Sequence, residues 1–359
     1  MRRRCAFVIV RDKSNPARMR FPSGGFSENP TFREVLRPLG ISSACEETDI
    51  PTTEYGARLV RLTDFFLTTS TRFPAPPAKI GVFEMTLPTS LNYPIIAIAD
   101  LHGQLDQLER LVARLELVSE WDDCALVFLG DFVDRGEDVP GTIDLVLDLL
   151  SRRPGGSAIL GNHDLALVRA ARLDDGPPSP YWIGSYLRRY DHDQTFLGYL
   201  GRAPNQGGGQ WEKDLEELKG AIPAEHRAFL VSLPWAVGSP GHLFLHCGLS
   251  PELGASPWEQ VAAMHLKRWD RSTLKPVAGT NTDLLWQPEY PVWIGAHKDL
   301  SKWPLEFPGK VQVTGHVQFS KPDVNSTRIR LDTSGGFGDL TACLLRSADA
   351  EPEFISSKP

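Results

Sequence analysis

Three short segments of this 359-residue chain carry residue types that can bind metal ions and transfer protons. They are ADLHG at 99–103, GDFVDRG at 130–136 and GNHD at 161–164. Each follows its own apolar run, and the three are nearly evenly spaced. One aspartate after a strand is usually a turn or a helix cap. Three such turns behind three strands predict a shared site.

The residues in these turns have the chemistry of a two-metal centre. Such a centre needs hard or borderline ligands, a carboxylate that bridges, and an open position for water. Two later strands, in HLFLHCG and KVQVTGH, also end in histidine. The candidate ligands are three oxygen donors and three imidazoles, namely Asp100, His102, Asp131, Asn162, His246 and His316. We expect this set to bind two divalent ions. Because the donors are oxygen and imidazole without sulfur, manganese is favoured, with iron or zinc as alternatives. Asp131, on the central turn, is the expected bridge.

The elements around these turns predict an α/β fold. YPIIAIAD, CALVFLGD and SAILGNHD are apolar runs typical of strands covered on both faces. Between them, Leu108, Leu111, Val112 and Leu115 recur at helical spacing, as do Ile143, Val146, Leu147 and Leu150. Alternating strands and helices imply a largely parallel sheet with ligands beyond the carboxyl ends of its strands. All three polar turns lie at those ends.

The remainder of the chain from residue 91 to 350 is expected to complete one domain. Residues 172–232 are predicted to be a helical insertion over the site, with a peripheral helical subdomain as the alternative. HLFLHCG, KVQVTGH, RIRLDT and TACLLRS are short apolar runs that suit a second sheet. Residues 351–359 are expected to be an unstructured tail.

Residues 1–90 differ in character and are predicted to be an N-terminal extension. Two strand-like runs flank a loop rich in proline and glycine, and PAPPAK at 74–79 resembles a linker. FPSGGFSE followed by CEETDI faintly resembles the Nudix hydrolase signature. Ser42 and Ser43 stand where that signature has arginine and glutamate, and the spacing is too long. The alternative is a structural or docking extension.

Composition narrows the class of protein. The net charge of −7 argues against nucleic acid as the main partner. The five cysteines are odd in number and form no CxxC pair, which is typical of a reduced cytosolic protein. Only six apolar residues follow the basic start MRRR, too few for a secretory or membrane-spanning segment. We therefore expect a cytoplasmic protein without a membrane partner.

The motifs together resemble a known family. ADLHG, GDFVDRG, GNHD, HCG and GH are similar to the five signatures of the phosphoprotein phosphatase family of calcineurin-like metallophosphoesterases, from about Tyr93 to Leu345. RIRLDTSGGFGDLTACLL is similar to the bacterial branch of serine/threonine protein phosphatases. The resemblance implies a calcineurin-like sandwich, in which two facing mixed sheets are flanked by helices.

The resemblance also implies roles for the metal ligands. Asp100, His102 and Asp131 would bind one metal, and Asp131, Asn162, His246 and His316 the other. A hydroxide that bridges the metals would attack phosphorus in line.

Four further residues have implied roles in catalysis and substrate binding. His163 would protonate the leaving oxygen, and Asp134 would orient His163. Arg135 would hold phosphate oxygens through its planar fork. A second phosphate-binding arginine is expected between the last two histidines, and Arg268 is preferred to Arg271.

The sequence departs from the family pattern at three positions. Ala99 replaces a glycine, Asp164 stands where the protein phosphatases usually have glutamate, and Val317 replaces a common threonine. None of the three changes removes a ligand. Asp164 weakens assignment to the eukaryotic type, because GNHD is common across the wider superfamily.

We expect a metal-dependent phosphomonoesterase that acts on phosphoserine or phosphothreonine, or with dual specificity on phosphotyrosine as well, in proteins or in small phosphorylated substrates. The alternative is a diadenosine tetraphosphate or nucleotide pyrophosphohydrolase, because relatives with that activity share the site. A non-catalytic binding protein on the same fold is the third hypothesis. The intact acid–base pair argues against it.

Overall fold

The computed structural model describes residues 9–10, 57–58, 91–153, 155–205, 210–253, 255–265, 293–295 and 304–358. The chain divides into two compact units, Met1–Met85 and Thr86–Pro359. In the first unit, β1 (Ile9–Val10) pairs antiparallel with β2 (Ala57–Arg58). The other residues of the N-terminal extension, with the Nudix-like segment, lie outside the described residues.

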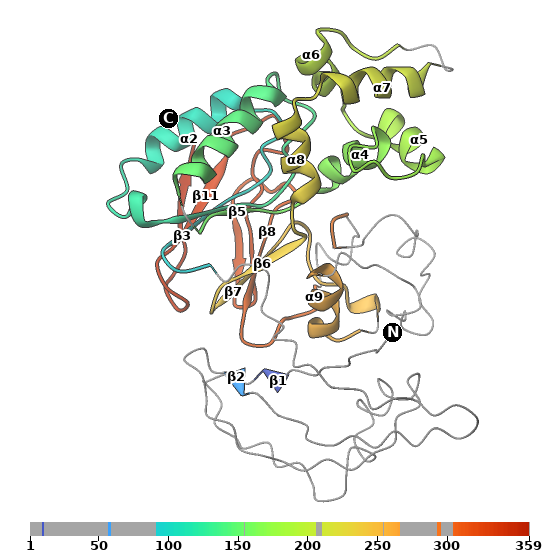
Figure 1. Ribbon diagram of the computed structural model, residues 1–359. Helices are drawn as coiled ribbons and strands as arrows, with labels where there is room; N and C mark the ends of the chain where they lie inside the picture. Colours follow the sequence, from blue (N-terminus) through green and yellow to red (C-terminus); the bar gives the residue numbers. More distant parts are fainter. Residues whose placement is uncertain are drawn as a thin grey trace, which may run out of the picture. The chain divides into compact units, whose positions relative to one another are not determined.

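The second unit is built on two mixed five-stranded sheets. The first has the order β12–β11–β3–β4–β5, made of β3 (Ile95–Ile98), β4 (Ala125–Phe128), β5 (Ser157–Ala158), β11 (Thr341–Leu345) and β12 (Glu353–Ser356). The second has the order β6–β7–β8–β10–β9, made of β6 (Ala236–Gly238), β7 (His242–Leu245), β8 (Val311–Thr314), β9 (Asp323–Asn325) and β10 (Arg328–Arg330). The predicted architecture of two mixed sheets with flanking helices is confirmed (Figure 1).

The pleat of the strands explains why both faces of the first sheet are apolar. In β3, Ile95 and Ala97 belong to a buried cluster that also contains Phe244 and Val313 of the second sheet. Ile96 and Ile98 point to the other face and join the cluster formed with the helices. Because successive side chains of a strand alternate between faces, a continuous apolar run fills both layers.

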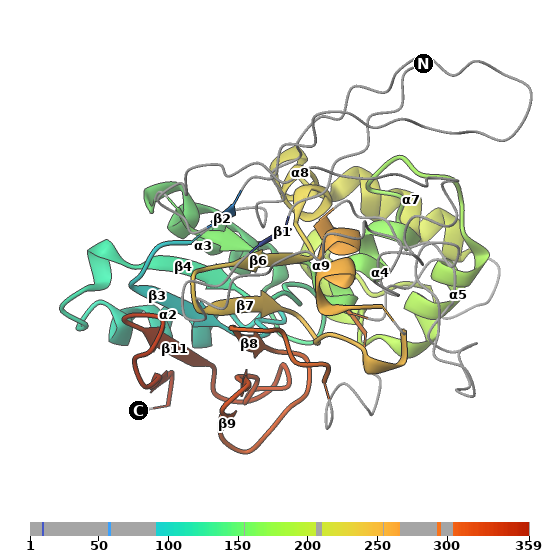
Figure 2. The same cartoon turned by 90° about the horizontal axis from the view of Figure 1, so that it is seen from below.

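Helices cover the outer face of the first sheet. α2 (Leu105–Leu115) packs against α3 (Val139–Arg152) and against β12. α4 (Asn162–Ala170), α5 (Pro180–Arg189), α6 (Asp193–Leu200), α7 (Trp211–Ala221) and α8 (Ala224–Ser232) follow β5. Both views place α4, α5 and α7 together, away from α2 (Figures 1 and 2). α9 (Pro257–His265) packs on β6, and two short 3-10 helices, Trp121–Asp123 and Pro251–Leu253, complete the described elements.

Two expectations about the C-terminal strands are wrong. TACLL does not join the second sheet: it forms β11, which pairs antiparallel with β3, Ala342 opposite Ile98. The last residues are not an unstructured tail either, because Glu353–Ser356 form β12 beside β11. β12 is an edge strand held by backbone hydrogen bonds, which need no strong apolar pattern. Sequence patterning therefore gives little signal for it.

Candidate metal centre

All six predicted ligands lie just beyond the ends of strands. Asp100 and His102 follow β3, Asp131 follows β4, and Asn162 opens α4 after β5. In the second sheet, His246 follows β7 and His316 follows β8. β3, β4 and β5 are parallel neighbours, and so are β7 and β8. Their carboxyl ends therefore meet at one edge of each sheet.

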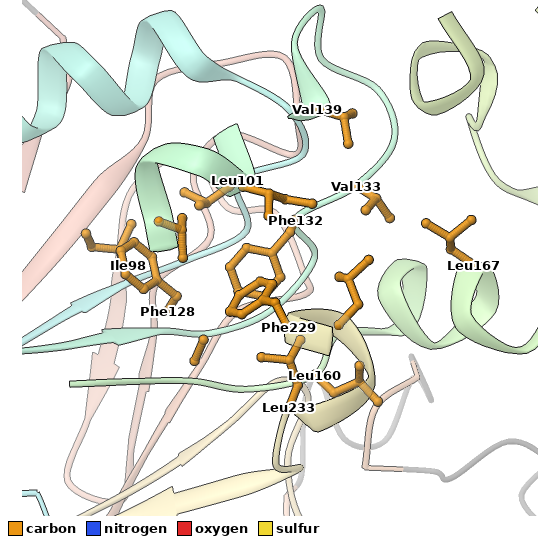
Figure 3. Packing of buried hydrophobic residues seen from close by; sticks show 14 of the residues in the cluster. Ile98, Leu101, Phe128, Phe132, Val133, Val139, Leu160, Leu167, Phe229 and Leu233 are labelled. Atoms are coloured by element: carbon orange, nitrogen blue, oxygen red, sulfur yellow. The ribbon is translucent and has the colours of Figure 1, made fainter. Parts of the chain in front are cut away.

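Two apolar side chains of the loop after β4 anchor this loop in the core. Phe132 and Val133 are fully buried and point into the core (Figure 3). The Phe132 ring meets Phe229 of α8 edge to face, with 5.1 Å between centroids. These contacts leave the polar residues Asp131 and Asp134 of the same loop free to face the site.

Glycines are required where the loops after β4 and β5 touch. Gly130 has a φ of 96°, and a Cβ there would lie 2.6 Å from the amide nitrogen of Gly161. A Cβ on Gly161 would lie 2.1 Å from Oδ1 of Asp131. Larger residues at either position would push the loops apart.

Backbone strain is concentrated at the site. Seven described residues other than glycine have positive φ, and five of them are predicted site residues: His102, Asp131, Asp134, Arg135 and His316. This conformation disfavours side chains with a Cβ and persists only where surrounding contacts enforce it. The strain marks the same place as the motifs.

Asp131 lies between two of the histidines. Its Oδ2 is 3.5 Å from Nε2 of His102 and 3.4 Å from Nε2 of His246. Its Oδ1 accepts a hydrogen bond from the backbone amide of His163 at 2.9 Å. Burial opposes ionisation, but the charges of His246 and His163 hold the pKa of Asp131 well below its usual range. An ionised carboxylate so placed can bridge two cations.

Backbone carbonyls fix the orientation of two imidazoles. Nδ1 of His102 donates to the carbonyl oxygen of Val133 at 2.8 Å, and Nδ1 of His246 donates to that of Leu129 at 2.7 Å. The Nε2 atom of each ring therefore faces the site, as metal-ligating histidines require. At Nε2 of His102 the guanidinium of Arg135 already donates, at 3.0 Å. That nitrogen can thus present its lone pair to a cation.

The second group of donors converges on His246. Its Nε2 lies 3.0 Å from Oδ1 of Asn162 and 3.1 Å from Nδ1 of His316. Burial lowers the pKa of His246, but the carboxylates of Asp131 and Asp100 outweigh it and raise the pKa to about 10. This environment favours a positive charge at Nε2, and metal binding exchanges such a proton for the metal.

A buried nitrogen of His316 also supports a metal site. Nε2 of His316 has no hydrogen-bond partner within the described ranges, although it is buried. Burial, followed by the charge of His246, lowers the pKa of His316 to about 3, so the ring is neutral at pH 7. A neutral imidazole with an unpaired buried nitrogen fits a metal ligand.

Two groups of side chains within the described ranges have ligand atoms close enough to share an ion. They are His102, Asp131 and His163, and Asp131, His246 and His316, with Asp131 common to both. Asp100 is in neither group, and both its oxygens accept from the amide of His316 at 3.0 Å. Burial and the charge of Asp332 raise the pKa of Asp100 well above its usual range. Its role as a ligand stays a prediction.

The predicted acid–base pair is present as a short contact. Nδ1 of His163 donates to Oδ2 of Asp134 at 2.6 Å, and both side chains are buried. Nη2 of Arg135 donates to Nε2 of His163 at 3.2 Å, and Nη1 of Arg135 donates to the carbonyl oxygen of Gly335 at 2.9 Å. Arg135 therefore reaches the ring nitrogen that Asp134 leaves free. Arg268 and Arg271 lie outside the described residues.

Two aspartates beside the site were given no role from the sequence. Asp164 accepts from the amides of Asp131 and Phe132, both at 2.8 Å, and from that of Gly161 at 3.0 Å. Asp332 accepts from the amides of Ser334 and Gly335, which shape the loop that Arg135 contacts. The position of Asp164 within GNHD could have suggested its role. Asp332 lies within RIRLDTSGGFGDLTACLL, a stretch that carried the family resemblance but no assigned role.

A family model described as calcineurin-like phosphoesterase matches residues 93–318, more than half of the chain. The chain belongs to the calcineurin-like phosphoesterase family. The resemblance to calcineurin-like metallophosphoesterases is thus confirmed. None of the helices in the described ranges combines the length and hydropathy needed to cross a bilayer.

Individual relatives of this calcineurin-like phosphoesterase match over shorter stretches. The bis(5'-nucleosyl)-tetraphosphatase, symmetrical, of Serratia proteamaculans is 38% identical over 108 residues, 30% of this chain and 36% of that protein. The serine/threonine-protein phosphatase BSL2 of Arabidopsis thaliana is 38% identical over 84 residues, 22% of this chain and 8% of that protein. The chain thus spans about a third of the first relative and less of the second.

Solved structures resemble the chain more distantly. The cold-active protein-tyrosine phosphatase of a psychrophilic Shewanella species is 19% identical, with a TM-score of 0.44 over 87% of this chain and 91% of that one.

Proposed function

We propose that the chain is a metal-dependent phosphomonoesterase that acts on phosphoserine and phosphothreonine residues of proteins. With dual specificity, the enzyme would also act on phosphotyrosine. The observation that carries the proposal is that His163 contacts both Arg135 and Asp134 and lies close to the possible ligands His102 and Asp131. Such a set could supply a phosphate clamp, an acid and a cation site.

The donor set fits two divalent ions. His102 and Asp131, with Asp100 as the predicted partner, would hold one ion, and Asp131, Asn162, His246 and His316 the other. Bound there, the ions would neutralise phosphate oxygens and lower the pKa of water. Oxygen and imidazole donors without sulfur favour manganese, iron or zinc.

The residues of the chain account for the remaining steps. Arg135 would turn its planar fork to the phosphate oxygens, which bind a guanidinium more strongly than a neutral imidazole does. Because Nδ1 of His163 is held by Asp134, the proton for the leaving oxygen would come from Nε2. The carboxylate of Asp134 stabilises the charged ring before that transfer.

A second candidate substrate is a dinucleoside tetraphosphate. The Serratia relative named a symmetrical bis(5'-nucleosyl)-tetraphosphatase favours it, as do relatives of the same name from Ralstonia and Yersinia. The same clamp and acid suit a phosphoanhydride, since the leaving atom is again an oxygen, here of a nucleotide phosphate instead of an alcohol.

A direct comparison of substrates tests the proposal. Manganese-loaded protein is offered phosphoserine, phosphothreonine and phosphotyrosine peptides beside diadenosine tetraphosphate, and kcat/KM is measured for each. Higher kcat/KM on peptides supports the phosphatase. Higher kcat/KM on the dinucleotide would replace it with the second candidate. Binding of two metals without turnover of either class would support a non-catalytic protein.

A further inference from the structure

Two hydroxyl groups from the helical insertion contact the carboxylate that holds His163. Oδ1 of Asp134 accepts from the hydroxyl of Tyr186 on α5 at 2.8 Å and from that of Thr195 on α6 at 2.6 Å. The other oxygen, Oδ2, accepts from Nδ1 of His163 at 2.6 Å. Asp134, Tyr186 and Thr195 are all fully buried. The two oxygens of the carboxylate are therefore assigned to different partners.

Thr195 also links the side chain of Asp134 to its own backbone. Its hydroxyl accepts from the amide of Asp134 at 3.0 Å and donates to Oδ1 of the same residue. Asp134 has a φ of 70°, a conformation that needs such outside support. Thr195 thus fixes both the backbone and the carboxylate of Asp134.

The segment between α5 and α6 contacts Arg135 and His163. The carbonyl oxygen of Asp191 accepts from the amide of Arg135 at 3.0 Å. The ring of Tyr190 meets the ring of His163 edge to face, with 4.7 Å between centroids. Contacts from one insertion therefore reach Asp134, Arg135 and His163.

We propose that Tyr186 and Thr195 are positioning residues that set the orientation of His163 as the acid. Because both hydroxyls occupy Oδ1, only Oδ2 is open to the imidazole, and Nε2 is held toward the leaving oxygen. This inference rests on the proposed phosphoesterase function. A side chain misplaced even slightly from its productive geometry loses much of its contribution to the rate.

A purely structural role makes a different prediction. If the hydroxyls only stabilise the fold, their loss would lower turnover of every substrate by the same factor. If they position the acid, the loss would depend on the leaving group, since a good leaving group departs without protonation. The leaving-group dependence of kcat therefore separates the two roles.

The chain offers a matched control for this experiment. The hydroxyl of Tyr199, in the same insertion, bonds Nδ1 of His226 at 2.8 Å. Tyr199→Phe removes one phenol hydroxyl, as Tyr186→Phe does, but leaves the contacts of Asp134 in place. Thr195→Ser keeps the hydroxyl that Thr195→Val removes.

Manganese-loaded wild type and variants are assayed with phenyl phosphate and with 2,4-dinitrophenyl phosphate, whose leaving group needs no proton. For Tyr186→Phe and Thr195→Val we expect kcat on phenyl phosphate to fall about tenfold or more, and on the dinitrophenyl ester less than about twofold. In Tyr199→Phe, and likewise in Thr195→Ser, kcat should change by the same factor on the two esters. Equal losses on both esters in Tyr186→Phe and Thr195→Val would overturn the proposal.

A second measurement does not depend on turnover. In zinc-loaded protein with ¹⁵N-labelled histidine, the Nδ1 proton of His163 should resonate far downfield, as protons donated to buried carboxylates do. We expect Tyr186→Phe to shift or broaden this signal and Tyr199→Phe to leave it unchanged. An unchanged signal in Tyr186→Phe would overturn the inference. A wild type that hydrolyses neither ester would refute the proposed function instead, while the signal still decides the contact.

Discussion

Nδ1 of His163 lies 2.6 Å from Oδ2 of Asp134, and neither side chain is open to water. The contact joins the loop after β4 to the first turn of α4, and it leaves Nε2 as the only ring nitrogen that can reach a substrate. An imidazole held in this way is suited to donate a proton to a leaving oxygen.

His163→Ala should therefore lower kcat by about 10²- to 10⁴-fold, the usual contribution of a general acid. The amide of residue 163, which donates to Asp131, is retained by the variant. Metal content should thus stay at two ions per chain, as measured by atomic absorption. Unchanged kcat in the variant would exclude His163 as the acid.

Arg135→Ala should weaken phosphate binding and turnover together, because the guanidinium is the planar donor nearest His163. We expect Arg135→Lys to recover little, since an ammonium group cannot form the paired hydrogen bonds of the fork. The measurement is the inhibition constant of inorganic phosphate. Arg346→Ala, which removes an exposed ion-paired arginine, is the control. Normal phosphate inhibition in Arg135→Ala would contradict the clamp.

Asp131→Asn should remove metal from the protein, because Asp131 is common to both groups of ligands. An amide is neutral and a poorer bridge than a carboxylate. Asp148→Asn on α3, which replaces a half-exposed carboxylate, should keep the wild-type metal content. Retention of two ions by Asp131→Asn would rule out a bridging role.

Asp164→Ala should destabilise the fold as well as the site. The carboxylate accepts from three backbone amides, those of Gly161, Asp131 and Phe132, and its loss leaves these donors buried without a partner. We expect the free energy of unfolding to fall by about 3 kcal/mol or more, measured by urea denaturation. Wild-type stability in the variant would show that water or a neighbour replaces the carboxylate.

The sequence predicted those site residues that directly follow an apolar strand. Asp131 and Asn162 each follow a buried apolar run, so strand periodicity and the rule for parallel sheets place them together. The apolar runs also predicted two sheets, and the family resemblance of the motifs implied that the sheets face each other. What the pattern could not reveal was β12, whose pairing with β11 depends on backbone hydrogen bonds rather than on side chains.

The contacts that support Asp134 could not be predicted from the sequence either. Tyr186 and Thr195 lie 52 and 61 residues from Asp134 in the chain, on helices whose aromatic residues also suit an ordinary core. Only tertiary packing brings them together. The positive φ of Arg135 had no signal either, because left-handed backbone outside glycine is usually marked by asparagine, aspartate or histidine.

The most direct test of the two-metal phosphoesterase is a metal titration. Protein stripped by chelation is titrated with Mn²⁺, and bound metal, melting temperature and hydrolysis of 4-nitrophenyl phosphate are followed on the same samples. We expect activity to saturate at two ions per chain, with a rise in melting temperature because the ions bind only the folded site. Full activity in the stripped protein, or no metal bound at saturating Mn²⁺, would contradict the account.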